Sequence, residues 1–217
     1  MTTDTTIQKK NVSPIILGFS GGLATSVCVT RRKEHYGRPI VTVTINTGGI
    51  DAEAAKDLER RSVALGAIEH VLVEARSVFF DRVLKYLIFG NVRRGQLYPL
   101  CVGAERAVQA QVVAAKAIEL GSATIAHGCT AAGNDQVRFE VALRTLAPDI
   151  EILAPVRDRA FKRPEQLAYL EARALPVPPR GDVVFDNVRF SYPTRPDHLA
   201  VDGVSFAVKA GEKVAVV

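Results

Sequence analysis

The fold of this chain is decided near its start, by the stretch Ile15-Ile16-Leu17-Gly18-Phe19-Ser20-Gly21-Gly22-Leu23-Ala24-Thr25-Ser26. The apolar run 15–19 predicts a buried strand, and the pattern over 25–36 predicts the helix after it. Between them, Ser-Gly-Gly lets backbone amides face a ligand without steric conflict. The helix start offers free N–H groups and a positive dipole end to an anion. The stretch therefore predicts a pyrophosphate-binding turn, unlike a Walker A loop because it lacks Gly-Lys-Thr/Ser. A plain tight turn is the alternative that Ser-Gly-Gly alone leaves open.

Short apolar runs and helical patterns keep alternating up to about residue 174. Further strands are predicted over 40–45, 70–73, 123–126 and 151–154, and further helices over 52–65, 77–89, 101–120, 134–146 and 164–174. Gly66 is expected to cap the end of one helix, and Ser77 the start of the next. Strands that alternate with helices imply an α/β fold, with a parallel sheet covered by helices on both faces.

A second turn with unusual chemistry lies at 126–139, which reads Ala-His-Gly-Cys-Thr-Ala-Ala-Gly-Asn-Asp-Gln-Val-Arg-Phe. Like the first turn, it follows a predicted strand, and parallel sheets bind ligands beyond the carboxyl ends of their strands. Arg138 can hold a carboxylate through two parallel donors, and Asp135 can pair with an ammonium group. Asn134 both donates and accepts hydrogen bonds. The two turns together predict one site for a nucleotide and a polar amino acid.

The string Gly133-Asn134-Asp135-Gln136-Val137-Arg138-Phe139 and the Ser-Gly-Gly turn resemble the signatures of argininosuccinate synthase. The resemblance covers about residues 13–178 and implies a Rossmann-like domain of the adenine nucleotide alpha hydrolase (HUP) type, which uses ATP with Mg²⁺. Members of that family activate the ureido oxygen of citrulline, which releases pyrophosphate and forms citrullyl-AMP. Aspartate then displaces AMP to give argininosuccinate, a step of arginine biosynthesis and of the urea cycle.

The same resemblance implies the residues of the site. Those expected to bind ATP are Gly18, Phe19, Ser20, Gly21, Gly22, Leu23, Thr25, Ser26, His127, Gly128 and Gly133. Citrulline would contact Tyr98, Asn134 and Arg138, and aspartate would contact Thr130, Asn134 and Asp135. No side chain is assigned to proton transfer or to metal binding, because catalysis would rest on positioning and charge stabilisation. From the residues alone, Tyr98 could cap the core, His127 could be a structural hydrogen-bonding group, and Arg138 could be a surface charge.

Three residues depart from the family pattern, and the mildest change is Ala132, which replaces a common lysine. Ala24 stands where the family usually has Asp, and Gly103 stands where many members carry a hydroxyl residue. An acidic residue at the mouth of a phosphate loop orders magnesium or the loop, so our hypothesis is that nucleotide binds while turnover suffers. The alternative is a non-catalytic adenine-nucleotide-binding module. Another ATP pyrophosphatase activity, such as amidation or tRNA thiolation, is disfavoured by the 133–139 string and by the lack of a catalytic cysteine pair.

The alternation of strand and helix patterns ends at a proline-rich junction at 176–181, and only strand patterns follow it. This junction divides a nucleotide-binding domain at 13–175 from a β segment at 182–217. Strands are expected over 183–190, 204–208 and 213–217. Residues 184–193 and 199–206 resemble the first strands of an ABC-transporter ATPase, with Tyr192 as the aromatic that stacks on adenine. The segment stops before a Walker A loop, and a small β-hairpin unit is the alternative. The synthetase domain and tetramer-forming helix of the homotetrameric family are not expected here, and residues 1–12 are expected to be disordered.

Composition narrows the remaining function classes. The 217 residues are 47% hydrophobic and 24% charged with a net charge of +5, as in a globular protein that binds anionic ligands. No basic cluster interleaved with aromatics suggests nucleic acid, and no apolar segment is long enough to cross a membrane. Three cysteines without a CxxC pair favour the reducing cytoplasm over disulfides or a metal site. The expected partners are therefore the small substrates.

Overall fold

The computed structural model describes residues 13–31, 36–95, 98–131, 133–178, 183–192, 194–209, 212 and 214. The chain divides into two compact units, Met1–Val177 and Pro178–Val217. The segment 1–12 and most of the strand expected at 213–217 lie outside the described residues.

The first unit is built on a five-stranded sheet of order β3-β2-β1-β6-β7, in which every neighbouring pair is parallel. Its strands are β1 (Ile15–Gly18), β2 (Ile40–Asn46), β3 (Glu69–Glu74), β6 (Thr124–His127) and β7 (Glu151–Leu153). All five predicted strands are confirmed within one or two residues. The chain moves from β1 outward to β2 and β3 and then returns to the other side of β1 as β6 and β7. The direction of winding therefore reverses between β1 and β6, where such sheets bind ligands.

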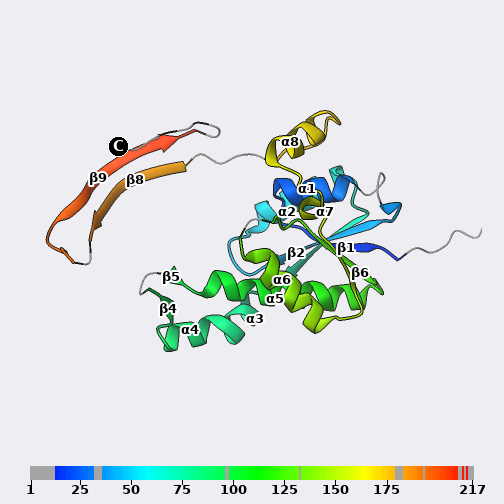
Figure 1. Cartoon of the computed structure of the whole chain (residues 1–217), viewed down its shortest axis with the longest axis horizontal. Coiled ribbons are helices and arrows are strands. Elements are labelled where there is room, and N and C mark those ends of the chain that lie inside the picture. Colours follow the sequence, from blue (N-terminus) through cyan, green and yellow to red (C-terminus); the bar gives the residue numbers. More distant parts are fainter. Residues whose placement is uncertain are drawn as a thin grey trace, which may run out of the picture. The chain divides into compact units, whose positions relative to one another are not determined.

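Helices cover both faces of this sheet, as the alternating pattern predicts (Figure 1). One face carries α1 (Leu23–Thr30), α2 (Ala52–Ala64), α7 (Pro155–Asp158) and α8 (Arg163–Glu171). The other face carries α3 (Arg76–Phe79), the π-helical turn η2 (Phe80–Leu84), α4 (Lys85–Phe89), α5 (Cys101–Glu119) and α6 (Asp135–Leu146). The two-strand arm of β4 (Arg93–Arg94) and β5 (Tyr98–Pro99), like α7, is too short for a periodic pattern to predict.

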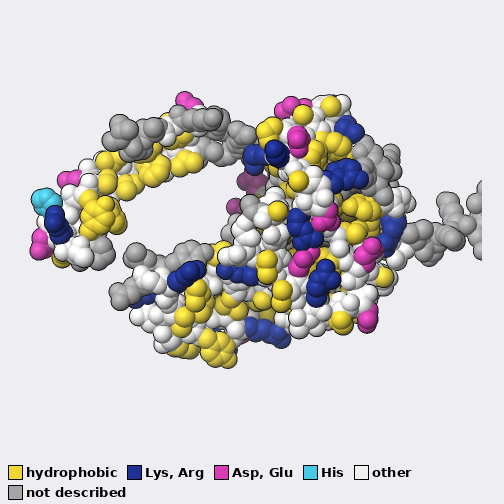
Figure 2. Space-filling view, in the orientation of Figure 1, with side chains coloured by type: hydrophobic (Ala, Val, Ile, Leu, Met, Phe, Trp, Pro, Cys, Tyr) yellow, Lys and Arg dark blue, Asp and Glu magenta, His cyan; other side chains and the backbone are white. Residues whose placement is uncertain are grey.

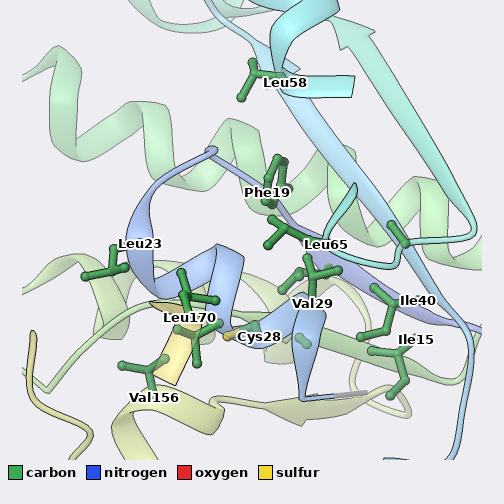
Figure 3. Close-up of a cluster of buried hydrophobic side chains, with 14 residues drawn as sticks. Ile15, Phe19, Leu23, Cys28, Val29, Ile40, Leu58, Leu65, Val156 and Leu170 are labelled. Atoms are coloured by element: carbon green, nitrogen blue, oxygen red, sulfur yellow. The ribbon is translucent and has the colours of Figure 1, made fainter. Parts of the chain in front are cut away.

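Two apolar clusters hold these layers together. Figure 3 shows the first, where side chains of β1, α1, α2, α7 and α8 meet, among them Ile15, Val29, Leu58, Val156 and Leu170. The second joins the opposite face of the sheet to α5 and α6 through Ile16, Val43, Val113, Phe139 and Leu143. The central strand β1 contributes alternate residues to the two clusters, as a strand buried on both faces must.

The helix ends agree with the sequence in one case and not in the other. Gly66 has φ +105° after α2, and the N–H groups of Gly66 and Ala67 donate to the carbonyls of Val63 and Ser62, which is the Schellman arrangement. The expected N-cap at Ser77 is wrong. The helix begins at Arg76 with Ala75 as N-cap, whose N–H donates to the Asn46 carbonyl of β2 and whose methyl side chain cannot cap the helix.

The second unit contains an antiparallel hairpin of β8 (Val183–Ser191) and β9 (Leu199–Val208), which confirms a small C-terminal β unit. Phe185 and Phe206 stack across it with ring centroids 4.4 Å apart. Register shifts interrupt the pairing between Phe185 and Ser191.

The surface in Figure 2 shows basic side chains of the first unit interspersed with acidic and apolar ones. Large apolar side chains are exposed along η2 and α4, where Phe80, Tyr86, Ile88 and Phe89 lie 49–86% exposed. Within the part of the chain that is described, no helix has both the length and the apolar character needed to cross a membrane.

Candidate functional site

A cavity of about 980 Å³ opens at the carboxyl edge of the sheet, around the point where the winding reverses. Its lining comes from the turn after β1 and the first turn of α1, from the loop after β2, from α5, from the turn after β6 with α6, and from the segment joining α7 to α8. Five separate segments of chain thus converge on one space, and both turns singled out in the sequence are among them.

The hydroxyl groups of the turn after β1 stabilise its backbone through hydrogen bonds. Gly21 has φ +70°, a conformation that favours glycine, and Gly22 is the extended N-cap of α1. The hydroxyls of Thr25 and Ser26 each donate to the Gly22 carbonyl at 3.0 Å. The Gly22 N–H points to the Ser20 hydroxyl at 3.3 Å. Backbone N–H groups at the start of α1 therefore lie beside the cavity, and no acidic side chain lies in that first turn.

The second turn is pressed against the first. A Cβ atom on Gly128 would lie 2.8 Å from Cγ2 of Thr25 and 2.9 Å from its backbone nitrogen. Real Cβ atoms do not approach other atoms so closely, so only glycine fits here without a shift of the backbone. Because β1 and β6 pair directly, with Gly18 opposite His127, the two turns form one continuous wall of the cavity.

His127 is a buried side chain at the end of β6. Its Nδ1 accepts from the Cys129 N–H at 3.3 Å, and its Nε2 lies 3.5 Å from Oε1 of Glu140. Glu140 in turn lies 2.6 Å from Nη1 of Arg157, a residue of α7 that lines the cavity. Burial lowers the pKa of His127, an effect that nearby Glu140 opposes. A neutral ring with its proton on Nε2 leaves Nδ1 to accept from the Cys129 N–H and faces Glu140 with a donor, so His127 holds the shape of the turn through its bond to Cys129.

A polar network along the cavity wall joins α5 to the loop after β2 and to α6. Glu105 accepts hydrogen bonds from Thr47 and, at 3.0 Å, from Gln109. Arg106 donates to Gln109 at 2.7 Å and to Asp135 at 3.3 Å. Asp135 also accepts from Arg138 at 3.3 Å, so two guanidinium groups fix the orientation of its carboxylate.

Most of the site residues expected from the sequence line the cavity, and some do not. Those that line the cavity are Gly18, Phe19, Ser20, Gly22, Leu23, Thr25, His127, Gly128, Thr130 and Asp135. The cavity lining does not include Gly21, Ser26, Gly133, Asn134 or Arg138. Tyr98 belongs to β5, and its side chain lies outside the described residues.

Several lining residues were missed by sequence reasoning. The loop after β2 contributes Thr47, Gly48 and Ile50, and the α7–α8 segment contributes Phe161, Lys162, Arg163 and Gln166. A signal for the first set existed, because β2 neighbours β1 and its end must reach the same edge of the sheet. No local signal marks Glu105 or Gln109 on α5.

A sequence model described as the arginosuccinate synthase N-terminal HUP domain matches residues 14–176. The chain belongs to this family. It is a family of nucleotide-binding HUP domains found in ATP-using enzymes.

Among solved structures, the NMN synthetase from Francisella tularensis is similar at a TM-score of 0.52 and 12% sequence identity. The match covers 76% of this chain, and the chain spans 63% of the length of that protein. At this identity the likeness shows a shared HUP fold alone. Neither comparison supports the resemblance of 181–217 to an ABC-transporter ATPase.

Proposed function

We propose that the first unit binds ATP across the two glycine turns and serves the reaction of argininosuccinate synthase. In that reaction citrulline and aspartate condense to argininosuccinate, and ATP becomes AMP and pyrophosphate, as in cytoplasmic arginine biosynthesis. The observation that carries the proposal is the approach of Gly128 to Thr25, which brings the family's two signature turns into one cavity at the winding reversal of the sheet.

The phosphates would lie at the start of α1, where free N–H groups and the positive end of the helix dipole favour anions. Four cationic side chains also line the cavity, namely Arg106, Arg157, Lys162 and Arg163. In the first step, the ureido oxygen of citrulline attacks the α-phosphorus and the bond to the bridging oxygen breaks. Pyrophosphate leaves with that electron pair, and the cationic lining would stabilise its charge.

The amino-acid substrates would lie nearer α6. Asp135, oriented by Arg106 and Arg138, offers a carboxylate to the ammonium group of aspartate, with Thr130 beside it on the cavity wall. Citrulline would meet Tyr98, Asn134 and Arg138, which stand near the arm and the start of α6. In the second step the amine of aspartate bonds to the ureido carbon, the bond from that carbon to the AMP oxygen breaks, and the amine proton is lost to solvent.

The described residues of this site fit a magnesium ion that is held by the phosphates of the nucleotide rather than by protein side chains. The described residues contain no group of three or more His, Cys, Asp or Glu side chains that could hold a metal ion, and Ala24 leaves the first turn of α1 without a carboxylate. Magnesium commonly keeps several waters and binds phosphate oxygens with few protein ligands. The ion would therefore enter on the phosphates of ATP.

A second candidate, favoured by Ala24, is a module that binds adenine nucleotide without cleaving it. One experiment separates the two: the full chain is incubated with magnesium-ATP, citrulline and aspartate, and AMP and pyrophosphate are measured, with citrulline omitted as control. Citrulline-dependent release supports the synthase reaction. Saturable ATP binding without release supports the binding module, and absence of ATP binding contradicts both.

A further inference from the structure

Arg61 reaches the phosphate-binding turn from behind, on the side away from the cavity. It lies near the end of α2, and its Nη1 donates to the Gly21 carbonyl at 2.9 Å. Neither Arg61 nor Gly21 lines the cavity, whereas Ser20 and Gly22 on either side of Gly21 do. The guanidinium therefore touches the turn without entering the site.

The contact sets the direction of one peptide group. In a trans peptide the C=O and the next N–H point in opposite directions. Because Arg61 holds the Gly21 carbonyl toward α2, the Gly22 N–H faces the opposite side, where it meets the Ser20 hydroxyl at 3.3 Å beside the cavity. A glycine pair would otherwise flip this peptide at little steric cost. Arg61 thus selects the orientation that presents a donor to an anion.

The guanidinium is itself held in place. Its Nε lies 2.7 Å from Oδ2 of Asp57, one helical turn earlier on α2, and the side chain is 20% exposed. The packing is tight, since a Cβ atom on Gly21 would lie 2.4 Å from Cδ2 of Leu58 and 2.8 Å from Nη2 of Arg61. Leu58 belongs to the apolar cluster of Figure 3, so the helix that carries Arg61 is itself packed against the core.

We propose that Arg61 is a positioning residue for the phosphate-binding turn: from α2 it fixes the Gly21–Gly22 peptide so that the Gly22 N–H, which donates to the Ser20 hydroxyl in this structure, is aimed at the side where the phosphates of ATP bind. This inference rests on the proposed nucleotide site. It assigns part of the affinity for phosphate to a residue that never contacts the ligand. Its effect is therefore confined to the phosphate-bearing part of the nucleotide.

The chain offers a matched control in the adjacent residue. Arg60 is also on α2 and also pairs with Asp57, but its side chain is 78% exposed and it makes no bond to the turn. Arg61→Gln and Arg60→Gln remove the same charge from the same helix. Any difference between the two variants therefore reports the contact with Gly21 rather than net charge.

The test measures dissociation constants for ATP and for adenosine by titration calorimetry, with thermal unfolding of each variant as a check on folding. We expect Arg61→Gln to weaken ATP binding about tenfold, the scale of one lost charge-assisted hydrogen bond, while adenosine binding and the Arg60→Gln variant stay near wild type. Arg61→Lys, which keeps one donor, should recover part of the loss.

Equal ATP affinity in wild type and Arg61→Gln overturns the inference, and so does an equal loss for adenosine. Should Arg61→Gln fail to fold, Asp57→Asn loosens the same guanidinium and should weaken ATP binding by a smaller factor; unchanged affinity there also overturns it. A wild-type chain that binds no ATP instead contradicts the proposed nucleotide site itself.

Discussion

The backbone of Gly128 lies against the first turn of α1 so closely that a Cβ atom there would stand 2.9 Å from the backbone nitrogen of Thr25. Two loops separated by about a hundred residues of sequence thereby share one surface. The close approach depends on the parallel pairing of β1 with β6, which sets Gly18 opposite His127.

Gly128→Ala should separate the two turns. The added methyl group overlaps Thr25, so we expect a loss of stability of about 1–3 kcal/mol and a fall in ATP affinity of about tenfold. Urea unfolding and calorimetric titration check the two effects. A variant that binds ATP as wild type does would show that the wall between the turns is not part of the nucleotide site.

Ala24→Asp should raise the affinity for magnesium-ATP and the rate of AMP release. The substitution places a carboxylate in the first turn of α1, which has no acidic residue now, and where a negative charge favours the helix by about 0.3–1 kcal/mol. We expect tighter binding of ATP with magnesium than without it, and faster release of AMP. Identical magnesium dependence in wild type and variant would contradict a role for this position in ordering the ion.

Stability should fall as pH drops below about 6.5, the ordinary pKa of histidine, because burial lowers the pKa of both His127 and His70 in the folded chain. The unfolded chain then binds more protons than the folded one, so stability is complete above this pH and declines below it, by at most about 1.4 kcal/mol per pH unit for each histidine. Carboxylates such as Glu140, whose pKa burial raises but Arg157 and His127 lower by more, lose their charge only in more acidic solution.

Urea unfolding of wild type, His127→Gln and His70→Gln at about pH 7.5 and pH 5.5 measures this dependence. Each single variant should lose part of the pH dependence. A slope that is unchanged in both variants would place its origin in other groups.

Glu140→Gln should loosen Arg157 at the cavity wall. The glutamate is the partner of Arg157 at 2.6 Å and lies 3.5 Å from His127, and both neighbours lower its pKa although burial opposes them. We expect a cost of about 1–3 kcal/mol, because the substitution removes the carboxylate that pairs with the Arg157 guanidinium. Replacing both residues, with Glu140→Gln and Arg157→Gln together, should cost less than the sum of the single changes; strict additivity would show that the pair is not coupled.

The sheet and most helices could be predicted because β1 and its neighbours are apolar runs bounded by glycine and polar turns. The position of the site followed from the same pattern, since parallel strands place Ser20 and His127 at one edge. The contacts that shape the site could not be predicted. His127, Glu140 and Arg157 come from β6, α6 and α7 and meet only through tertiary packing, and Arg61 reaches Gly21 across forty residues of sequence.

The start of α3 shows why local rules can fail. Ser77 has the chemistry of an N-cap, but the N–H of Ala75 donates to the Asn46 carbonyl of β2, and the helix starts two residues earlier than a cap at Ser77 requires. Sheet pairing therefore overrides the capping preference of a single side chain.

We propose above that ATP occupies the surface shared by the two turns. Titration of the isotope-labelled full chain with ATP, followed through backbone amide NMR signals, locates the bound nucleotide. We expect saturable shifts concentrated at Ser20–Ser26 and at Gly128–Thr130, with little change in the β8–β9 hairpin. Shifts confined to other parts of the chain, or none at saturating ATP, would contradict it.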